Sequence, residues 1–454
     1  MKNDILFKLS FLISRLIYLI VRKMGKKGTA LPGKIAMKIK PDILNDLSSR
    51  CDNIAIVSGT NGKTTTNNLS NHIFKGKDFK VLSNLNGSNM IQGVISPFII
   101  DKKKHYDWGI FEVDEGSMPV INKYMVPDYI ILTNFFRDQL DRYGEVEKVI
   151  KTVYDSIKHE STTLILNGDS PTSLYFDDLK NSKIYYSLEK TKFSRDDETS
   201  AESVTCPKCN NKLNYEYITY GNIGKYYCLK CGVKNPKPHY VISKTELKDN
   251  LYDFTVCDKY GSSKIKLGLL GIYNLYNVLG AISLARENNF SYDLIKKQIE
   301  NFEFKEGRME IINTSSSKVI LGLTKNPIGL SEILSIIWAD NSKKSVMFVL
   351  NDYAPDGRDI SWIWDVFIKE NNDFSNIDKF FCVGTRAEEI ALRLKYIDFP
   401  EEKLVIYHSK DRYDIEEPIL TIISQNNKNY ILGTFTAMPE AKKIIMKIKK
   451  EESL

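Results

Sequence analysis

The chain has 454 residues, of which 42% are hydrophobic and 27% are charged. This composition is typical of a globular protein with sizeable cores, and the length predicts two or three domains. The net charge of +7 belongs to one end, because residues 1–40 contain ten Lys or Arg and one acid, whereas residues 41–454 contain 54 basic and 56 acidic residues. Because residues 41–454 carry no excess positive charge, the sequence argues against a protein that binds nucleic acid.

Residues 1–50 are a basic segment that we expect to be amphipathic. The stretch DILFKLSFLISRLIYLIVRKMGKKG, residues 4–28, places Asp4, Lys8, Arg15 and Arg22 on one stripe of a helical wheel, with apolar residues on other faces. It is too short and too charged for a membrane-spanning helix, and no small-residue cleavage site follows it. Two interpretations stand with equal weight: the helix lies on an anionic membrane surface, or it packs on the protein's own core.

A glycine-rich loop, SGTNGKTT at residues 58–65, follows the apolar run NIAIV and precedes a helical pattern. A strand, a glycine loop and a helix in this order place backbone N–H groups around phosphate oxygens. The spacing departs from the usual phosphate loop, because Val57 occupies the position of its first glycine. We favour nucleotide binding over a purely structural turn. The residues predicted to bind ATP are Gly59, Thr60, Asn61, Gly62, Lys63, Thr64 and Thr65.

Acidic residues end the next predicted strand, which lies in YDWGIFEVDEGS at residues 106–117. An acid at the carboxyl end of a parallel strand beside a phosphate loop is suited to bind Mg²⁺. We predict that Glu112, the acid nearest to the strand, and the hydroxyl of Thr64 hold Mg²⁺, and that Lys63 and Glu112 take part in catalysis. For Asp114 and Glu115 a solvated acidic loop is a competing interpretation.

Asparagines in two other places are candidate nucleotide contacts. Asn134 follows the apolar run DYIILT, and Asn274 begins a helical pattern that places Asn277 on the same face. Asparagines at a helix start are often only caps, and the paired spacing is what favours a nucleotide contact for Asn274.

Four of the seven cysteines form two CxxC pairs, Cys206 with Cys209 and Cys228 with Cys231, separated by 18 residues. This spacing predicts a tetrahedral Zn²⁺ site of four thiolates, which leaves no open position and is therefore structural. A redox CxxC is the alternative interpretation. We expect a zinc-ribbon insertion at about residues 200–240. The other cysteines suggest no disulfide framework, which is typical of a cytoplasmic protein.

From residue 313 to residue 454 the pattern alternates between strands and helices, which predicts a second, Rossmann-like α/β domain. Its polar signature is TKNPIGL, residues 324–330, and LNDYAPDGRDISWIWD, residues 350–365. The second motif follows a buried strand, where an open α/β sheet binds its ligands. A turn at Asp356-Gly357 with core tryptophans is the plainer interpretation, but the motif contains more acids than a turn requires.

The motifs GTNGKTTT, FEVDEGS, TNFFRDQLDR, LNGDSP, GIYNLYN and GRMEII follow one another in the order found in the Mur ligase superfamily. The chain resembles these enzymes, which use ATP to convert a carboxylate into an acyl phosphate and then into an amide. The resemblance implies a Mur-ligase-like P-loop ATPase domain over residues 51–312 and a nucleotide contact at Arg308. Gln139 stands where related enzymes often have His. Because the loop lies early in the chain, we expect no preceding domain for a nucleotide-linked sugar and a lipid-linked substrate instead.

The zinc insertion and the C-terminal motifs are similar to those of the MurT family, the ligase subunits of lipid II isoglutaminyl synthase. That resemblance implies amidation of D-glutamate in lipid II, with Asp356 as a catalytic residue that handles ammonia. No cysteine lies in a G-x-C-x-G elbow, so we expect ammonia to come from a GatD-like glutamine amidotransferase in a heterodimer. The resemblance also implies a cytoplasmic location, at the inner face of the membrane if the N-terminal helix touches lipid.

Two rival interpretations remain at this point. One is another Mur-family ligase that adds an amino acid or glutamate to a carboxylate. The other is a zinc-ribbon ATPase that binds nucleic acid, which the charge balance outside the N-terminal segment disfavours.

Overall fold

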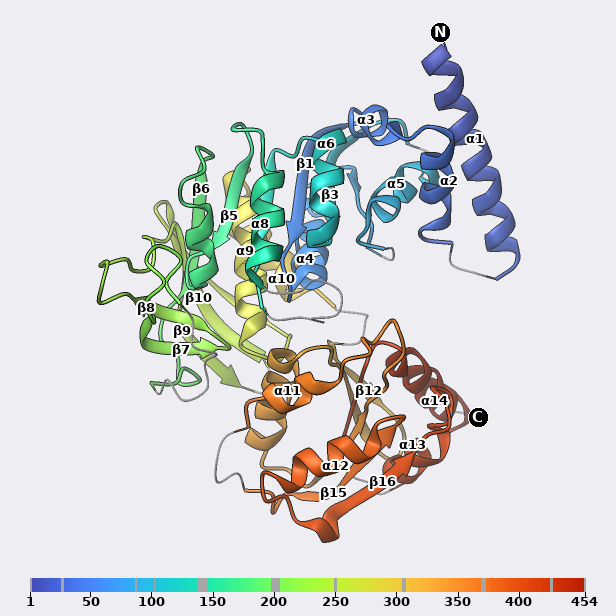
Figure 1. Ribbon diagram of the computed structural model, residues 1–454, viewed down its shortest axis with the longest axis vertical. Coiled ribbons are helices and arrows are strands. Elements are labelled where there is room, and N and C mark those ends of the chain that lie inside the picture. Colours follow the sequence, from blue (N-terminus) through green and yellow to red (C-terminus); the bar gives the residue numbers. More distant parts are fainter. Residues whose placement is uncertain are drawn as a thin grey trace. The chain divides into compact units, whose positions relative to one another are not determined.

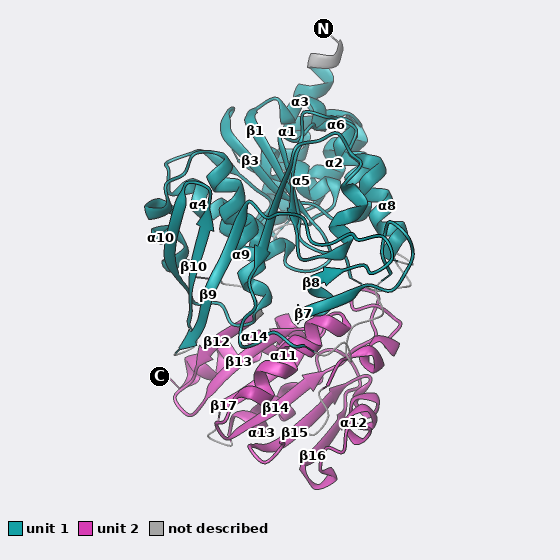
Figure 2. Ribbon diagram, turned by 90° about the vertical axis from the view of Figure 1, so that its left-hand side faces the viewer, with its two compact units in different colours: residues 1–136, 145–302 teal, residues 137–144, 303–454 magenta. Residues whose placement is uncertain are grey.

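The computed structural model describes residues 2–25, 28–85, 88–101, 103–136, 146–196, 205–248, 251–303, 308–368, 373–424 and 428–452. Contacts divide these residues into two compact units (Figure 2). The first unit contains the described residues up to 302 and the second contains those from 303 onward. The first unit therefore includes the basic N-terminal segment as well as the predicted ATPase domain.

The first unit is built on a nine-stranded sheet in the order β11-β10-β9-β6-β5-β4-β1-β3-β2 (Figure 1). Pairing is parallel from β2 to β9, and β9, β10 and β11 form an antiparallel meander at the other edge. The apolar, β-branched runs are buried on both faces, as parallel strands between helices must be. The strands are β1 (Cys51–Ser58), β2 (Val81–Leu82), β3 (Tyr106–Glu112), β4 (Tyr129–Leu132), β5 (Thr163–Asn167), β6 (Lys183–Leu188), β9 (Tyr240–Lys248), β10 (Leu251–Asp258) and β11 (Gly261–Leu267).

Helices pack on this sheet and on one another. Helix α9 is buried along nearly its whole length and contacts α4, the helix that follows the glycine loop. The helices are α1 (Lys2–Lys23), α2 (Leu31–Ile39), α3 (Ile43–Ser48), α4 (Lys63–Lys75), α5 (Ile91–Ile100), α6 (Met118–Tyr124), α8 (Val146–Ser156), α9 (Tyr273–Glu287) and α10 (Tyr292–Glu300). Among the described residues, none of the helices has the length and apolar character needed to cross a membrane.

The N-terminal helix α1 packs on α2 through small side chains. Ser10 and Ser14 are fully buried, and the Ser10 hydroxyl donates to the carbonyl of Ala36 at 3.0 Å. Helix α2 in turn approaches α5 so closely that a Cβ at Gly33 would lie 2.0 Å from the carbonyl oxygen of Gln92. One side of α1 therefore packs on the protein, as the second of the two sequence interpretations requires.

The cysteine-rich insertion contains a two-stranded antiparallel sheet, β7 (Asn214–Tyr220) and β8 (Ile223–Tyr227). Its base is joined to the main sheet by Asn235, whose side-chain amide donates to the carbonyls of Gly168 and Gly224 at 3.1 and 3.0 Å. The insertion is thus bonded into the first unit at its base.

The second unit has a six-stranded sheet in the order β12-β13-β17-β14-β15-β16, in which β12 is antiparallel and the rest are parallel. Strand β12 pairs with β13, so residues 308–312 lie in the second unit rather than at the end of the first, where the sequence prediction puts them. The elements are β12 (Arg308–Asn313), β13 (Lys318–Leu323), α11 (Pro327–Ala339), β14 (Lys344–Val349), η3 (Ser361–Asp365), β15 (Ile377–Gly384), α12 (Ala387–Lys395), η4 (Glu401–Lys403), β16 (Leu404–His408), α13 (Glu416–Ile423), β17 (Lys428–Gly433) and α14 (Ala437–Glu451).

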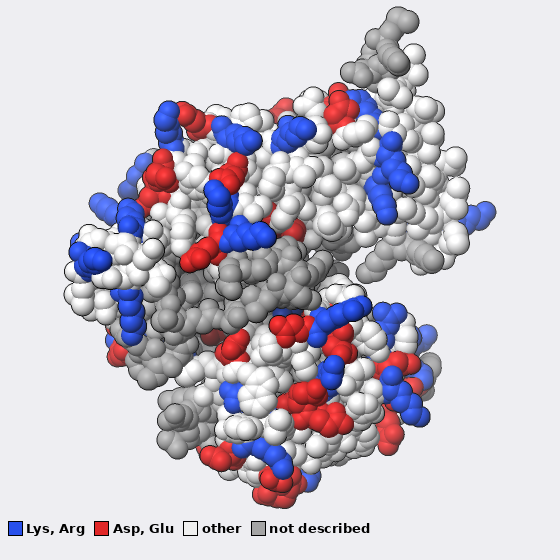
Figure 3. Space-filling model, in the orientation of Figure 1, with Lys and Arg blue, Asp and Glu red and all other residues white. Residues whose placement is uncertain are grey.

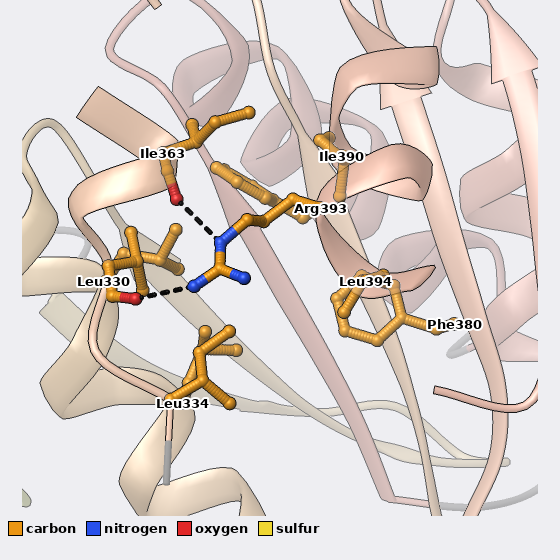
Figure 4. A pocket seen from close by; sticks show the side chains of 10 residues that line it. Leu330, Leu334, Ile363, Phe380, Ile390, Arg393 and Leu394 are labelled. Atoms are coloured by element: carbon orange, nitrogen blue, oxygen red, sulfur yellow. Dashed lines mark hydrogen bonds between the residues drawn. The ribbon is translucent and has the colours of Figure 1, made fainter. Parts of the chain in front are cut away.

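A cavity of about 30 Å³ lies between α11, η3 and α12 (Figure 4). Arg393 extends along its wall and donates to the carbonyls of Ile363 and Val366 at 3.3 and 2.9 Å, which fixes η3 against α12. Ile363 is buried there, whereas Trp364 is 41% exposed. The aliphatic residue, rather than that tryptophan, fills the core behind the acidic motif.

Candidate active site

The glycine loop connects β1 to α4 as the sequence predicts, and its shape depends on two glycines. Gly59 and Gly62 have φ values of 119° and 87°, which L-residues with a side chain rarely adopt. A Cβ at Gly59 would lie 2.4 Å from Oγ1 of Thr133, and one at Gly62 would lie 2.0 Å from Oδ1 of Asn277. Neighbouring elements therefore enclose the loop tightly on two sides.

Asn134 holds the loop from the end of β4. Its side chain accepts from the N–H of Asn61 at 2.9 Å and donates to the carbonyl of the same residue at 3.0 Å. Its own carbonyl accepts from the N–H of Thr60 at 2.8 Å. The described contacts of Asn134 within the loop are thus with backbone, and its predicted nucleotide contact stays a prediction.

Lys63 begins α4 and folds back over the loop. Its ammonium group donates to the carbonyl of Gly59 and lies 3.2 Å from both carboxylate oxygens of Glu115. The two side chains are only 8% and 7% exposed. The first-turn N–H groups of α4 have no acceptor within the helix, and their partial positive charge suits an anion.

Glu115, rather than Glu112, is the acid that pairs with Lys63. Glu112 lies opposite Val57 in the β1–β3 register, and its side chain accepts from Nδ2 of Asn89 at 3.3 Å. Glu115 lies three residues beyond the strand, in the short turn η1 (Glu115–Ser117). Sequence reasoning preferred the acid nearest to the strand and missed the one that the turn directs to the loop. The assignment of Mg²⁺ to Glu112 and Thr64 remains a prediction, with Glu115 as a further carboxylate at the loop.

On α9, Asn277 rather than Asn274 is the residue next to the loop. Its side-chain oxygen would meet a Cβ at Gly62, and its amide donates to Oδ1 of Asn274 at 2.9 Å. Asn274 donates to the carbonyl of Leu270 at 2.6 Å. The two asparagines act as a pair in which Asn274 orients Asn277. The nucleotide contact predicted for Asn274 is not tested by this geometry.

A buried carboxylate, Asp169, joins the insertion to α9. It accepts hydrogen bonds from the hydroxyls of Ser187 and Tyr276 at 2.7 and 2.9 Å, from the N–H of Leu188 at 2.8 Å and from the amide of Asn235 at 3.1 Å. Burial raises the pKa of Asp169 to about 6. The LNGDSP motif contains this residue, but only the fold shows that its partners come from three separate places in the chain.

The four cysteines of the two CxxC pairs meet as predicted. Their sulfur atoms all lie within 4.8 Å of one another, with Cys206 and Cys231 3.6 Å apart and Cys209 and Cys228 3.5 Å apart. The backbone N–H of Cys231 lowers the pKa of Cys228 to about 6, which favours the thiolate form that binds metal. Four sulfur donors at such distances fit a tetrahedral Zn²⁺ ion.

In the second unit Asp356 is 4% exposed and faces the start of α14. Its two carboxylate oxygens accept from the N–H and the hydroxyl of Thr436 at 2.7 and 2.6 Å. The N–H of Asp356 donates to the carbonyl of Tyr353 at 2.8 Å, and Gly357 has a φ of 88°, so a turn is part of this motif. Burial raises the pKa of Asp356.

Other polar groups gather at the same edge of the second sheet, beyond β14 and β15. Asp352 accepts from Oγ1 of Thr385 and from Nε of Arg386, at 3.0 and 2.8 Å. The side chain of Asn351 donates to Oγ1 of Thr436 at 3.2 Å, so this asparagine and Asp356 share a partner. This is the edge of the sheet at which the sequence predicts a ligand, and the ligand itself stays a prediction.

Two predicted features are not placed in a site by the structure. Arg308 begins β12 in the second unit, opposite Gly322. Gln139 and the rest of the RDQLDRYGE stretch lie outside the described residues.

Two family models match the chain: the Mur ligase middle domain matches residues 57–285, and the MurT ligase C-terminal domain matches residues 323–438. The lipid II isoglutaminyl synthase (glutamine-hydrolyzing) subunit MurT of Staphylococcus aureus (strain COL) is 36% identical over 374 residues, which cover 82% of this chain and 84% of that protein. The subunit of the same name from Streptococcus pneumoniae (strain ATCC BAA-255 / R6) is 34% identical over 444 residues, 96% of each chain.

A solved structure with a similar fold is a pseudomurein peptide ligase type C from Methanothermus fervidus, with a TM-score of 0.69 and 23% identity over 87% of this chain and 79% of that one. The matched middle domain and the nucleotide-type loop define a Mur ligase, a class of ATP-dependent enzymes. Within that class, the chain belongs to the MurT family. The predicted order of a Mur-type ATPase domain and a second α/β domain is confirmed.

Proposed function

We propose that this chain is the ligase subunit of a lipid II isoglutaminyl synthase. In the proposed reaction, ATP transfers its γ-phosphoryl group to the α-carboxylate of D-glutamate in the lipid II stem peptide, which gives an acyl phosphate and ADP. Ammonia attacks the carbonyl carbon, inorganic phosphate leaves and the nitrogen loses a proton, so that D-isoglutamine forms. The observation that supports this best is the buried ion pair between Lys63, at the end of a phosphate-type loop, and Glu115, in a chain of the MurT family.

The loop supplies the first half-reaction. Backbone N–H groups at the start of α4 and the ammonium group of Lys63 are positioned to bind phosphate oxygens, where negative charge is spread during phosphoryl transfer. Mg²⁺, held by Thr64 and Glu112 with Glu115 in reach, would neutralise further charge on the phosphates.

Asp356 is proposed to handle ammonia in the second half-reaction. Its carboxylate is held rigidly by Thr436, and its raised pKa makes it a better proton acceptor than an ordinary aspartate. It would orient the incoming nitrogen or take up the proton that the nitrogen loses.

Glutamine hydrolysis is assigned to a separate, GatD-like subunit. Burial raises the pKa of the Cys51 and Cys382 thiols to about 12, so neither is a nucleophile at neutral pH. Cys257 lies on β10, in a β-meander rather than in a nucleophile elbow. The remaining cysteines form the proposed structural Zn²⁺ site.

The test is mass spectrometry of a water-soluble lipid II analogue incubated with the purified chain, ATP, Mg²⁺ and ammonium. Conversion of the glutamate carboxyl to an amide is expected, with ammonium but not with glutamine as the nitrogen source. Asp356→Asn should abolish amidation and leave the KM for ATP unchanged. Asp411→Asn, at an exposed carboxylate that also accepts from a backbone N–H in the same unit, is the matched control.

Three results would contradict the proposal: ATP hydrolysis with the glutamate carboxyl unconverted, glutamine use by the single chain, or a product that has gained an amino acid. The last result would support the rival ligase that adds an amino acid to a carboxylate.

A further inference from the structure

The outer side of α1 is apolar and exposed to solvent. Its apolar side chains repeat at helical spacing and are each between 47% and 64% exposed; they are Ile5, Leu9, Leu12, Leu16, Leu19 and Ile20. A helix of a soluble protein normally turns such a stripe to the core. In Figure 3 this helix, at the upper right, shows a largely uncharged surface with basic residues at its margins.

Contacts on the inner side fix this orientation. Ser10 and Ser14 are buried against α2, and the guanidinium group of Arg50 lies 5.4 and 5.1 Å from the ring centroids of Phe7 and Phe11. Rotating the apolar stripe inward would break these contacts and place large side chains where only serine fits. The exposed stripe is therefore a consequence of the packing of α1.

Basic residues border the stripe. Lys8, Arg15 and Arg22 follow one another at seven-residue spacing, so on a helix they form a line along one edge of the apolar side chains. No acidic residue occurs in the sequence from Ile5 to Pro41. An apolar stripe with a cationic border is complementary to an anionic lipid surface, in which acyl chains lie beneath negatively charged headgroups.

An open cavity of about 540 Å³ lies beside the carboxyl half of this helix. Tyr18 and Arg22 line it on the α1 side, and Asn84, after β2, lines the other. Asn84 is bonded to both backbone groups of Glu112, at 2.8 and 2.9 Å. The cavity thus leads from the apolar helix toward the acidic end of β3, next to the phosphate loop.

We propose that α1 is an interfacial anchor that lies in the plane of an anionic membrane, with its apolar stripe inserted among the acyl chains. The proposal rests on the proposed function, because a lipid-linked substrate is what such an anchor would bring to the cavity. Lys8, Arg15 and Arg22 would contact the headgroups. The helix packs on the first unit by its other side, so the anchor does not have to detach in order to bind.

The test is co-sedimentation of the full-length chain with vesicles of phosphatidylglycerol and phosphatidylcholine, and with vesicles of phosphatidylcholine alone. Binding is expected to the anionic vesicles and to fall with added salt. Leu12→Gln with Leu16→Gln should reduce the bound fraction about tenfold, because two large apolar side chains are lost from the inserted face. Leu392→Gln with Leu420→Gln, at exposed leucines elsewhere, is the control and should bind as the wild type does.

Leu12 and Leu16 point away from the protein. An unchanged thermal midpoint would therefore show that the α1 variant folds. The variant should amidate the water-soluble analogue at the wild-type rate and lose activity on lipid II in anionic vesicles. Failure with the soluble analogue in the wild type would contradict the proposed function, whereas equal vesicle binding by wild type and variant would overturn only the anchor. Loss of a homodimer or of the glutaminase complex in the variant would also overturn it, because a protein would then cover the stripe.

Discussion

The ammonium nitrogen of Lys63 lies 3.2 Å from both carboxylate oxygens of Glu115, and both side chains are less than one-tenth exposed. Removing one partner of a buried ion pair leaves the other charge without compensation. A bound nucleotide would bring a second group of anionic oxygens to the same lysine. The carboxylate of Glu115 and the phosphates therefore compete for Lys63 unless a cation lies between them.

We expect Glu115→Gln to lower the free energy of unfolding of the nucleotide-free protein by about 3 kcal/mol, because Lys63 stays buried and loses the charge of this carboxylate. In EDTA the same variant should bind ATP more tightly than the wild type, since the competing carboxylate is gone. Urea unfolding and calorimetric titration measure the two effects. Glu112→Gln, which leaves the ion pair intact, is the control. Weaker ATP binding by Glu115→Gln in EDTA would show that the carboxylate assists the phosphates rather than competing with them.

Gly62→Ala should raise the KM for ATP by more than about tenfold, because an L-residue at this positive φ costs roughly 1–2 kcal/mol and the loop must also move away from Asn277. Gly261→Ala is the matched control, since Gly261 has a φ of 151° with open space around it. It should lower stability and leave the KM unchanged. A normal KM in Gly62→Ala would mean that the enclosed loop is not the nucleotide site.

Metal analysis should find about one Zn²⁺ per chain in the wild type and none in Cys228→Ser, because a tetrahedral site cannot form from three thiolates and a hydroxyl with similar affinity. Cys257→Ser, at a cysteine outside the cluster, should keep the metal. A strong chelator should lower the thermal midpoint of the wild type. An unchanged metal content in Cys228→Ser would refute the four-thiolate site.

Asp169 predicts a pH effect on stability. Its pKa is about 6 in the folded protein, whereas the ordinary value for an aspartate is 3.8, so folding favours the protonated form. Its contribution to stability is therefore greatest below pH 4 and is lost as the pH rises through 6. The difference in unfolding free energy between the wild type and Asp169→Asn should be larger at pH 4.5 than at pH 7.5 by about 2 kcal/mol. Urea unfolding at both pH values measures it, and a difference that is the same at both would contradict the shifted pKa.

Local patterns were sufficient to predict the parts of the site that lie close together in the sequence. The strand, the loop and the start of α4 are consecutive, and the two CxxC pairs are each encoded within four residues. The family motifs also predicted the order of the two domains along the chain. Such features are decided by short-range geometry, which spacing and residue type describe directly.

Contacts between distant residues could not be predicted in this way. Asp169 and Tyr276 are 107 positions apart, and no periodicity shows that they meet. Whether Glu112 or Glu115 reaches Lys63 depends on how the chain turns after β3. The sequence FEVDEGS does not specify that turn. For α1 the two sequence interpretations were alternatives, whereas the structure packs one face on the protein and leaves the other exposed.

The bonds from Asn134 to Asn61 and Thr60 have a consequence for the order in which the loop acquires its shape. The end of β4 supplies these bonds, so the loop is completed only when β4 has joined the sheet beside β1. The conformational entropy of the loop is then lost during folding, so a nucleotide binds to a loop that is already ordered. Cutting these bonds should therefore weaken nucleotide binding through disorder, even though the phosphate-facing groups all remain.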